Sequence, residues 1–538
     1  MESQTITLKT ETISPNKVPY YSDKDLAYQL LDDRYKSFYK LTPNLESFKQ
    51  AIQEKQKHEV DRVLLTEVIQ EQYNRREFSN SQERNWNLLK DNNTFTVVTA
   101  HQPSLFTGPL YYIFKICSTI KLAQELNDKY SEYNFVPLFI SGGEDHDFDE
   151  INHVHIFNKE VKWEMDVSGP VGRIPIDGQF EKIIDEFTAI LGDQKYGEEI
   201  KNLLKLSRDK STIYGEFNFH LANNLFSNYG LLVLGMDDRR LKSSFIPIME
   251  KELLEMPSRG IVMETQTKLE KVGFSSQAYP RIINLFYLQD NLRSRIEKGG
   301  DKEYYVVDTN IQWSEEELLV ELHEYPERFS PNVIMRPLYQ EHTLPNLAYI
   351  GGGGEIAYWL ERKDQFEFFK IPFPILMRRN SAMLVPTYIQ DQINDLELDI
   401  TTFFGDEDLI INNFLAEQTT IEIDLAEEKK DLEKVFDKIA WKAEQIDPPL
   451  AKWILAESTK NQKLVDQMES RIRRSIKKRE ENKVKQIRKV KNKLFPGNGL
   501  QERYDNFFQY YLEEGPSLIE KLIETFDPVS NDFYMIKL

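Results

Sequence analysis

Residues Phe135–Phe157 read FVPLFISGGEDHDFDEINHVHIF, and this stretch decides how the rest of the chain is interpreted. It opens with a nearly continuous apolar run that ends at Ile140. A short apolar run bounded by turn residues predicts a strand covered on both faces, as in a parallel sheet. Ser141-Gly142-Gly143 then ends the run, because glycine lets the backbone turn sharply and approach a ligand closely.

An acidic cluster follows this turn directly. Five carboxylates fall within seven residues, and histidines and an asparagine are interspersed or follow: Glu144, Asp145, His146, Asp147, Asp149, Glu150, Asn152, His153 and His155. Open α/β sheets bind ligands at the carboxyl ends of their strands. A solvated acidic loop is the alternative interpretation, based on charge alone. The nearby histidines and the preceding glycines favour a ligand site.

A second polar loop precedes this strand in the chain. Thr94–Ala100 is rich in β-branched residues and predicts a strand, and His101–Gly108 leaves its carboxyl end. Thr107 can cap the next helix, and Pro109 suits its first turn. Strand, loop, helix and strand together match a βαβ crossover, so both polar loops are expected at one crevice. The alternative is that His101 and Gln102 only cap backbone groups.

Two further strand ends carry polar residues. Asp237 and Asp238 follow the apolar run 231–235, where they either contact a ligand or cap a helix. Asn346–Ile350 predicts a strand that runs into four glycines, residues 351–354, and then into a helix over 355–368. Amides at such a helix start bind phosphate or carboxylate, although a plain tight turn is the alternative. Another strand is expected at 374–377, followed by Arg378 and Arg379.

The remaining segments predict supporting structure. Residues 1–90 are expected to form a helical support, with Leu65, Val68 and Ile69 on one apolar face. A hairpin or small β insertion is predicted within 161–178, helices up to about residue 228, and strands over 279–288 and 303–308. We divide the chain into the support at 1–90, a core at 91–385 with insertions near 160–228 and 260–330, a coiled-coil domain at 386–496, and a segment at 497–538 that docks back on the core.

Composition excludes several classes of protein. The 538 residues carry a formal charge of −20, which argues against nucleic-acid binding because phosphates attract basic surfaces. No signal-peptide pattern and no run long enough for a membrane helix is found, so we expect a cytoplasmic protein without membrane contact. The single cysteine, Cys117, excludes an internal disulfide, and its helical spacing predicts a buried thiol.

The segment from about residue 386 changes character. Apolar residues recur at heptad-like or four-residue steps on either side of Pro448-Pro449, where the chain is expected to reverse: Leu425, Leu432, Val435, Ile439, Ile446, Leu464, Met468, Ile472 and Ile476. This pattern predicts an antiparallel coiled hairpin. The basic run 471–479 is interpreted as a solvated face, with phosphate or acidic-partner contact as the minority alternative.

Five motifs, in order along most of the chain, resemble one known family. They are HQPSLFTGPLYYIFK from His101, SGGEDHDFDEINHV from Ser141, SPNVIMRPLYQ from Ser330, LPNLAYIGGGGEIAYW from Leu344 and LFPGNGLQER from Leu494. Together they resemble the cysteine ligases of bacillithiol biosynthesis. The resemblance implies an α/β fold with a Rossmann-like parallel-sheet core, connecting-peptide insertions and an α-helical coiled coil used for homodimerisation. The HxGH and KMSKS motifs of the similar nucleotidyltransferases are not intact in this chain.

The resemblance also implies the reaction, which is addition of L-cysteine to glucosaminyl-malate to give bacillithiol. We assign base and amine binding to Asp145, His146 or Asp147. Arg336 or Arg378 is expected to pair with a substrate carboxylate. ATP or ADP is expected as a nucleotide of undecided role, and no metal is expected. The predicted substrate-binding residues are Gln102, Thr107, Gly108, Glu144, Asn152, His153, Arg336, Gln340, Tyr349, Gly351, Gly352, Glu355 and Arg378.

Two alternatives stay open at this stage. Asp145, Asp147, His153 and His155 offer ligands for a metal-dependent hydrolase or transferase. A nonenzymatic dimeric scaffold built on the coiled coil is the third hypothesis, and it leaves the two converging polar loops unexplained.

Overall fold

The computed structural model describes residues 9–73, 78–300, 303–417 and 424–538. Each of the predicted ranges 1–90, 91–385 and 386–496 includes some residues outside this description. The side chain of Ile476 also lies outside it. The chain divides into two compact units, which are Met1–Leu384 with Gly499–Leu538, and Val385–Asn498. Each unit has its own internal packing and is described separately.

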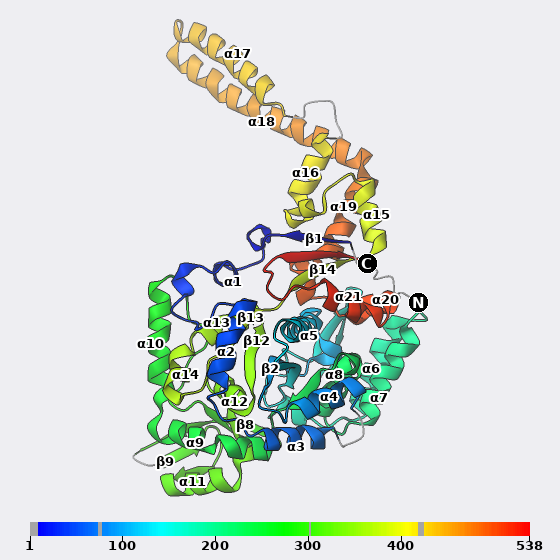
Figure 1. Ribbon diagram of the computed structural model, residues 1–538. Helices are drawn as coiled ribbons and strands as arrows, with labels where there is room; N and C mark the ends of the chain where they lie inside the picture. The colour runs from blue at the N-terminus through cyan, green and yellow to red at the C-terminus, as the bar shows by residue number, and fades with distance from the viewer. Residues whose placement is uncertain (1–8, 74–77, 301–302, 418–423) are drawn as a thin grey trace. The chain divides into compact units, whose positions relative to one another are not determined.

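The first unit is built around a five-stranded sheet of order β13-β12-β2-β3-β6 (Figure 1). All four pairings are parallel, which confirms the predicted fold class. The strands are β2 (Thr94–His101), β3 (Asn134–Ser141), β6 (Leu232–Gly235), β12 (Asn346–Gly351) and β13 (Ile375–Arg378). When these five strands are numbered by their order along the chain, their order across the sheet is 3-2-1-4-5. The strand order therefore reverses between β2 and β12. Open α/β sheets bind ligands at such a switch point.

Helices cover the sheet and explain the continuous apolar runs of its strands. Residues of β2 and β3 are buried over nearly their whole length. The helices α5 (Tyr111–Lys129) and α8 (Tyr214–Phe226) pack along β3, α2 (Phe48–Lys55) packs along β12, and α13 (Gly353–Leu360) packs along β13. Cys117 on α5 is fully buried, as its spacing predicts.

The helices described in the N-terminal part are short. They are α1 (Asp23–Gln29), α2, α3 (Arg62–Gln72) and α4 (Asn80–Leu88). Leu65, Val68 and Ile69 form the buried face of α3, as predicted. The strand β1 (Thr10–Ile13) pairs with β15 (Phe533–Lys537) in a sheet of order β1-β15-β14, where β14 is Ser381–Val385. The C-terminal segment also supplies α20 (Phe508–Glu514) and α21 (Ser517–Thr525) to this unit.

The segment between β3 and β6 contains a hairpin and three helices. The hairpin pairs β4 (His153–Ile156) with β5 (Lys159–Lys162), so the prediction of a hairpin within 161–178 is wrong in position. Phe157 and Asn158 form its two-residue turn with positive φ angles of 49° and 60°, and Phe-Asn is not a recognisable turn signal. The helices are α6 (Gly178–Leu191), α7 (Gly197–Asp209) and α8.

The chain after β6 forms α9 (Arg239–Glu255) and α10 (Pro257–Lys271) and then an antiparallel sheet of order β10-β9-β8-β7-β11. Its strands are β7 (Leu285–Gln289), β8 (Leu292–Lys298), β9 (Glu303–Val306), β10 (Gln312–Ser314) and β11 (Phe329–Pro331), with α11 (Glu315–Glu324) between the last two. The strand observed in the predicted range 279–288 is β7, which begins at Leu285, six residues after the predicted start. The side chain of Asn284 instead donates to Glu252 and to the Arg281 carbonyl.

The chain after β11 returns to the central sheet through α12 (Arg336–Thr343) and β12. The predicted helix over 355–368 is two helices, α13 and α14 (Lys363–Phe369). They are separated at Glu361 and Arg362, which form a fully buried ion pair at 3.3 Å. No glycine or proline marks this break, because it depends on buried partners and leaves no local signal.

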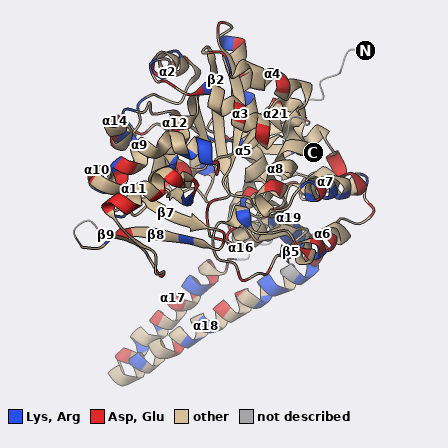
Figure 2. Ribbon diagram, turned by 90° about the horizontal axis from the view of Figure 1, so that it is seen from below, with Lys and Arg blue, Asp and Glu red and all other residues tan. Residues whose placement is uncertain are grey.

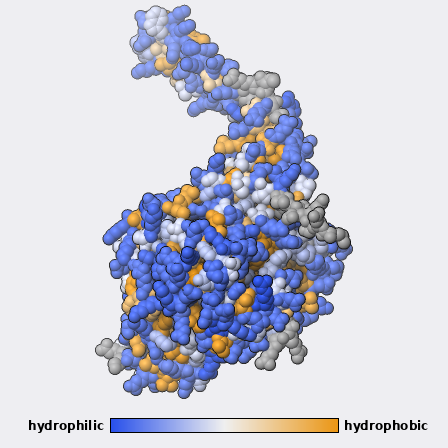
Figure 3. Space-filling model, in the orientation of Figure 1, coloured by the Kyte–Doolittle hydropathy of each residue, from blue (hydrophilic) through white to orange (hydrophobic). Residues whose placement is uncertain are grey.

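Charged residues are frequent on the outer helices and rare on the central strands. Figure 2 shows them on α6, α10 and α11 and along α17 and α18. The face in Figure 3 is largely hydrophilic, with small dispersed apolar patches. Across the described residues, no helix has both the length and the apolar character needed to cross a membrane.

The second unit is helical. It contains α15 (Thr387–Asp395), α16 (Glu407–Glu417), α17 (Ala426–Glu444), α18 (Pro448–Arg479) and α19 (Glu481–Leu494). The helices α17 and α18 pack as the predicted antiparallel hairpin and reverse just before Pro448. Their buried contact is made mainly by alanines, namely Ala440, Ala443 and Ala451, with Ile454. The predicted apolar stripe is instead largely exposed in the single chain, with Ile446 at 82% and Met468 at 50%.

Candidate active site

A cavity of about 620 Å³ lies at the carboxyl ends of the central strands. Every central strand contributes to its wall through the residues that follow it. Gln102 comes from the end of β2, Asp145 from β3, Asp237 from β6, Gly353 from β12 and Arg379 from β13. The cavity spans the point where the strand order reverses, so the position is the one that the topology predicts for a ligand.

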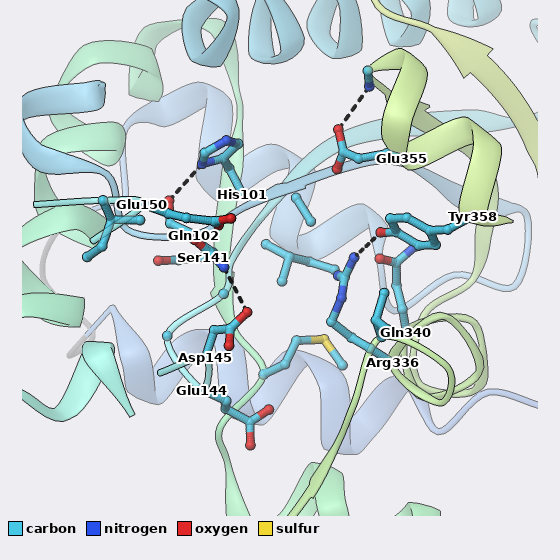
Figure 4. Close-up of a pocket in the computed structure, with 18 of the residues that line it drawn as sticks. His101, Gln102, Ser141, Glu144, Asp145, Glu150, Arg336, Gln340, Glu355 and Tyr358 are labelled. Atoms are coloured by element: carbon cyan, nitrogen blue, oxygen red, sulfur yellow. Dashed lines mark hydrogen bonds between the residues drawn. The ribbon is translucent and has the colours of Figure 1, made fainter. Parts of the chain in front are cut away.

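The two polar loops predicted to face each other meet at this cavity. The side-chain amide of Gln102 donates a hydrogen bond of 2.7 Å to Asp145 Oδ2 (Figure 4). The backbone of the two loops is also joined, because the amide of Gly142 donates to the His101 carbonyl at 2.8 Å. The parallel register explains this contact, since His101 pairs with Ser141 at the last position of the two strands.

The glycine turn after β3 is required by a close backbone contact. The Gly172 amide donates to the Gly143 carbonyl at 2.8 Å, and the Val171 amide donates to the Asp145 carbonyl at 2.7 Å. A Cβ atom on Gly172 would lie 2.7 Å from Gly143 Cα, which is closer than real Cβ contacts allow. The insertion after β5 therefore holds the turn that carries Asp145.

Asp145 is held as a carboxylate. Burial alone would raise its pKa, but the His146 side chain and the Arg293 guanidinium outweigh burial and hold the pKa below its usual range. Arg293 Nη1 lies 3.2 Å from Asp145 Oδ1 and 2.6 Å from His146 Nδ1. Arg293 comes from β8 and is 3.9 Å from the centre of the Phe286 ring, so the inserted sheet contributes directly to the site.

A buried ionic cluster closes the β6 side of the cavity. The ammonium of Lys242 contacts Glu144 and lies 2.9 Å from Asp237 Oδ1, and Asp237 is also bound by Arg173 at 2.8 Å. Burial would lower the pKa of Lys242, but the two carboxylates outweigh it and raise the pKa. Burial raises the pKa of Glu144 despite the lysine. Asp238 caps α9, whereas Asp237 lines the cavity.

Glu355 forms a second ionic cluster on the β12 side. Its carboxylate lies 2.8 Å from the buried Lys115 ammonium and accepts from Tyr349 Oη at 2.6 Å and from the Gly352 amide at 2.9 Å. Burial would raise the pKa of Glu355, but Lys115 and these hydrogen bonds lower it to about 2. Glu355 is therefore an anion at neutral pH whose charge is already compensated.

His101 also lines the cavity and is neutral. Its Nδ1 lies 2.9 Å from the Gln102 carbonyl oxygen, which only accepts, so Nδ1 carries the proton and Nε2 is an acceptor. Burial, together with the nearby Lys115 charge, lowers the pKa of His101 to about 4. The imidazole is thus uncharged at neutral pH.

The adjacent residues Arg378 and Arg379 lie in different environments. Arg379 lines the cavity and pairs with the buried Glu502 at 2.6 Å. Arg378 pairs with Asp25 at 3.1 Å and does not line the cavity. Side chains at successive positions of extended backbone point to opposite sides, which accounts for the difference. Arg336 also lines the cavity and donates to Tyr358 Oη at 2.8 Å.

The structure brings about half of the predicted site residues together. Those at the cavity wall are Gln102, Glu144, Asp145, Arg336, Gln340, Gly352 and Glu355. Those that do not line it are Thr107, Gly108, His146, Asp147, Asn152, His153, Tyr349, Gly351 and Arg378. Tyr349 acts behind the wall through Glu355, and His146 acts through Asp145.

Most of the other predicted residues have structural partners. Gly108 accepts from the Asn506 side chain at 2.8 Å. Thr107 is buried beside it, but its Oγ1 has no hydrogen-bond partner among the described residues and does not cap α5, which begins at Tyr111. Asp147 Oδ1 accepts from the Glu150 amide at 3.3 Å. The Asn152 and His153 side chains lie 3.2 Å apart and contact each other. These contacts tie the loops down, which is the role that capping and turn residues commonly have.

Several residues at the site were not found from the sequence. They are Lys115, Arg173, Lys242, Arg293, Tyr339, Tyr358, Arg379 and Arg503. Most lie on segments with ordinary local patterns, so no sequence signal marked them. Arg379 had a signal, since it follows a predicted strand end directly. His101 and Asp237 are each predicted as either a site residue or a capping residue, and both line the cavity.

The side chains proposed as metal ligands contact different neighbouring residues. Asp145 is bound by Gln102 and Arg293, whereas the His155 ring stacks on Tyr504 at 4.1 Å. Among the described residues, no group of three or more histidine, cysteine, aspartate or glutamate side chains is placed to hold a metal ion. The geometry therefore lends the metal-dependent alternative no support.

The parallel sheet with a polar cavity at its switch point, together with a helical hairpin domain, defines a Rossmann-like α/β protein with a coiled coil. The family description "Bacillithiol biosynthesis BshC, N-terminal Rossmann-like domain" matches residues 1–380, and "Bacillithiol biosynthesis BshC, C-terminal coiled-coil domain" matches residues 382–538. The chain belongs to this BshC family of bacillithiol biosynthesis.

Three curated relatives carry the name "Putative cysteine ligase BshC". The relative from Christiangramia forsetii is 38% identical over 98% of this chain and 99% of its own length. The one from Flavobacterium johnsoniae is 38% identical over 99% and 100%, and the one from Flavobacterium psychrophilum is 40% identical over 98% and 100%. These similarities confirm the family recognised from the five motifs and show a ligase that acts in bacillithiol biosynthesis.

Proposed function

We propose that the chain joins the carboxyl group of L-cysteine to the amine of glucosaminyl-malate through an amide bond, giving bacillithiol. Family membership and the names of the relatives support the class of reaction. The observation that carries the proposal is the switch-point cavity itself. It presents carboxylates suited to an ammonium group and cationic or amide groups suited to carboxylates within one cavity.

The proposed bond needs a source of free energy. A carboxylate and an ammonium do not condense spontaneously in water. The cysteine carboxyl therefore has to carry a better leaving group, which ATP attaches to it or which an activated acyl donor already brings, and this group departs as the amide bond forms. The nucleophile is the neutral amine, which forms only when the ammonium loses a proton. The protein therefore has to hold the ammonium, orient the acyl group and exclude water.

Asp145 is the residue that we propose to hold the substrate ammonium. It lines the cavity, and its orientation is set by Gln102 on one side and Arg293 on the other. Because its pKa is held below the usual range, it stays charged at neutral pH, which favours ion pairing over proton abstraction. Glu144 lies next to it and completes the acidic side of the cavity.

We also propose that two copies of the chain associate through the hairpin of α17 and α18. Trp441 and Trp453 are 65% and 60% exposed on these helices, and further large apolar side chains on them are at least 40% exposed. Exposed apolar surface of this kind is typical of a protein interface. A second copy is the proposed occupant because the heptad-like repeat of α17 and α18 suits coiled-coil pairing.

The test is product formation by the full-length protein. L-cysteine and glucosaminyl-malate are incubated with and without ATP, and the mass of the product is measured. We expect bacillithiol in at least one arm, and Asp145→Asn is expected to lose it while Asp147→Asn keeps it. The two variants make the same charge change, and only the first lies at the cavity. Absence of product from the wild type in both arms, or full activity of Asp145→Asn, would overturn the corresponding proposal.

A further inference from the structure

We propose that the Gly352–Gly354 turn and Arg379 form an oxyanion subsite that holds a carboxylate or phosphate group of a substrate. The identity of the candidate ligands rests on the proposed function. The subsite itself follows from two independent observations, an arginine with an unused buried donor and a helix start that lines the same wall of the cavity.

The first observation concerns Arg379. Its Nη1 and Nη2 donate to Glu502 at 2.9 and 2.6 Å, so this pair fixes the guanidinium. The residue is 3% exposed, and among the described residues no acceptor lies within hydrogen-bond distance of its Nε. A buried donor without an acceptor is costly, so such a group calls for a partner.

The Arg379 Nε lies beside the glycine turn. The Arg379 amide donates to the Gly351 carbonyl at 2.9 Å, which places the residue beside the end of β12. Its Nε lies 3.9 Å from the position that a Cβ atom on Gly352 would take. Arg379 and residues 352–354 all line the cavity, so an acceptor bound there would face both.

The second observation concerns the start of α13. Gly353 and Gly354 are its first two residues, where backbone amides have no partner within the helix and carry the positive end of the helix dipole. A Cβ atom on Gly353 would overlap Asp25, so this glycine is needed for packing. A Cβ atom on Gly354 would meet no atom within 4 Å, so this position borders open space.

The charges nearby favour an anion. The carboxylates of Glu355, Asp25 and Glu502 are each engaged by a cation, namely Lys115, Arg378 and Arg379. Arg336 and Arg503 bring further positive charge to the cavity wall. A forked guanidinium and helix-start amides suit planar carboxylates and phosphates equally well. The malyl carboxylates of glucosaminyl-malate and the phosphates of ATP are thus the two sources of the same chemistry.

The test measures binding to the full-length protein by calorimetry, with L-malate, inorganic phosphate and ADP as separate ligands. Arg379→Lys keeps the charge beside Glu502 but removes Nε, and Gly354→Ala fills open space without a clash. We expect Arg379→Lys to weaken binding of the ligand about tenfold or more, as loss of one charged hydrogen bond implies. Gly354→Ala is expected to weaken binding as well, because its methyl group occupies space that the ligand needs. Arg378→Lys is the matched control, since it changes the adjacent buried arginine outside the cavity, and it is expected to bind normally.

The outcomes separate the ligand sources and the two proposals. Binding of L-malate alone assigns the subsite to a carboxylate, and competitive binding of phosphate or ADP assigns it to a phosphate. Failure of all three to bind the wild type, or unchanged affinity in both cavity variants, overturns the subsite even if bacillithiol is formed. If ligands bind and the variants lower their affinity but no bacillithiol appears, the subsite is supported and the proposed reaction is contradicted.

Discussion

The Gln102 amide donates a hydrogen bond of 2.7 Å to the Asp145 carboxylate, and this bond joins the loops that leave two neighbouring parallel strands. Arg293 from the inserted sheet approaches the same carboxylate from another side at 3.2 Å. Three segments far apart in the chain therefore set the position and charge of one side chain. This arrangement makes the site sensitive to changes that hardly affect folding.

Removal of the Gln102 amide is expected to affect catalysis more than stability. The bond is only partly buried, so Gln102→Ala should cost less than about 1.5 kcal/mol of unfolding free energy. Product formation should fall about tenfold because Asp145 loses one of the contacts that orient it. Urea denaturation and initial rates measure the two effects. Gln50→Ala, on the exposed face of α2, serves as the control and should change neither. Unchanged rates for Gln102→Ala would contradict the role of the bond.

Gly172→Ala is expected to displace the turn that carries Asp145. The added methyl would lie 2.7 Å from Gly143 Cα, and overpacking of this kind costs about 1–3 kcal/mol. We expect lower stability in chemical denaturation and lower product formation. Gly178→Ala at the start of α6 is the matched control, since its methyl would meet no atom within 4 Å. Equal behaviour of the two variants would show that the close backbone contact does not matter.

The Glu355–Lys115 pair is expected to contribute to stability and to its pH dependence. Glu355→Gln leaves the buried Lys115 ammonium unpaired, which should cost about 3–5 kcal/mol at pH 7. The folded-state pKa of about 2 lies below the ordinary value of 4.5. The contribution is therefore complete above about pH 4.5 and is lost as the pH falls towards 2.

Chemical denaturation at several pH values tests this pair. The wild type should lose stability between pH 4.5 and 2 more steeply than Glu355→Gln. Adding Lys115→Met to Glu355→Gln should restore part of the loss, because a neutral pair leaves no buried charge. Glu46→Gln, which disrupts the exposed pair with Lys129, should have little effect. Parallel pH profiles of wild type and Glu355→Gln would refute the assignment.

Cys117 is expected to be unreactive in the native protein. It is fully buried on α5, and burial raises its pKa far above the ordinary range, so no thiolate is available. An aromatic disulfide reagent should label no thiol at pH 8 until a denaturant is added, and it should then label one. Fast labelling of the folded protein, with loss of product formation, would indicate a reactive thiol.

The hairpin surface is expected to control oligomeric state. The double substitution Trp441→Glu with Trp453→Glu should convert a dimer to a monomer, because charged residues are costly at the centre of an apolar interface. Light scattering coupled to gel filtration gives the mass. Leu409→Glu, equally exposed on α16 but outside the hairpin, should leave the dimer intact. A monomeric wild type at micromolar concentration would contradict the proposal.

Local sequence patterns were sufficient for the strands that matter most. The apolar run ending at Ile140 and the β-branched run before His101 predict β2 and β3 because fully buried parallel strands are apolar at every position. The hairpin at Phe157-Asn158 and the break at Glu361-Arg362 were missed. Their conformations depend on tertiary contacts, and the local residue types do not mark them.

The apolar stripe of the coiled coil shows a different limit. Its spacing correctly predicts two antiparallel helices, but periodicity does not tell which apolar residues face the partner helix of the same chain. The contact within the hairpin uses small alanines, which leaves Val435, Ile439 and Met468 exposed. A periodic pattern predicts only that one face of a helix is buried against another element, and it does not identify that element.

The amino-acid sequence alone determined the family, the parallel sheet and the edge at which polar loops gather, because these depend on motif order, on continuous apolar runs and on strand direction. Tertiary structure decided which side chains enter the cavity. Arg379 faces it while Arg378 does not, and Arg293 reaches Asp145 from an insertion about 150 residues away in the chain. Such choices depend on the direction of each side chain and on long-range packing, and neither is encoded in the spacing of neighbouring residues.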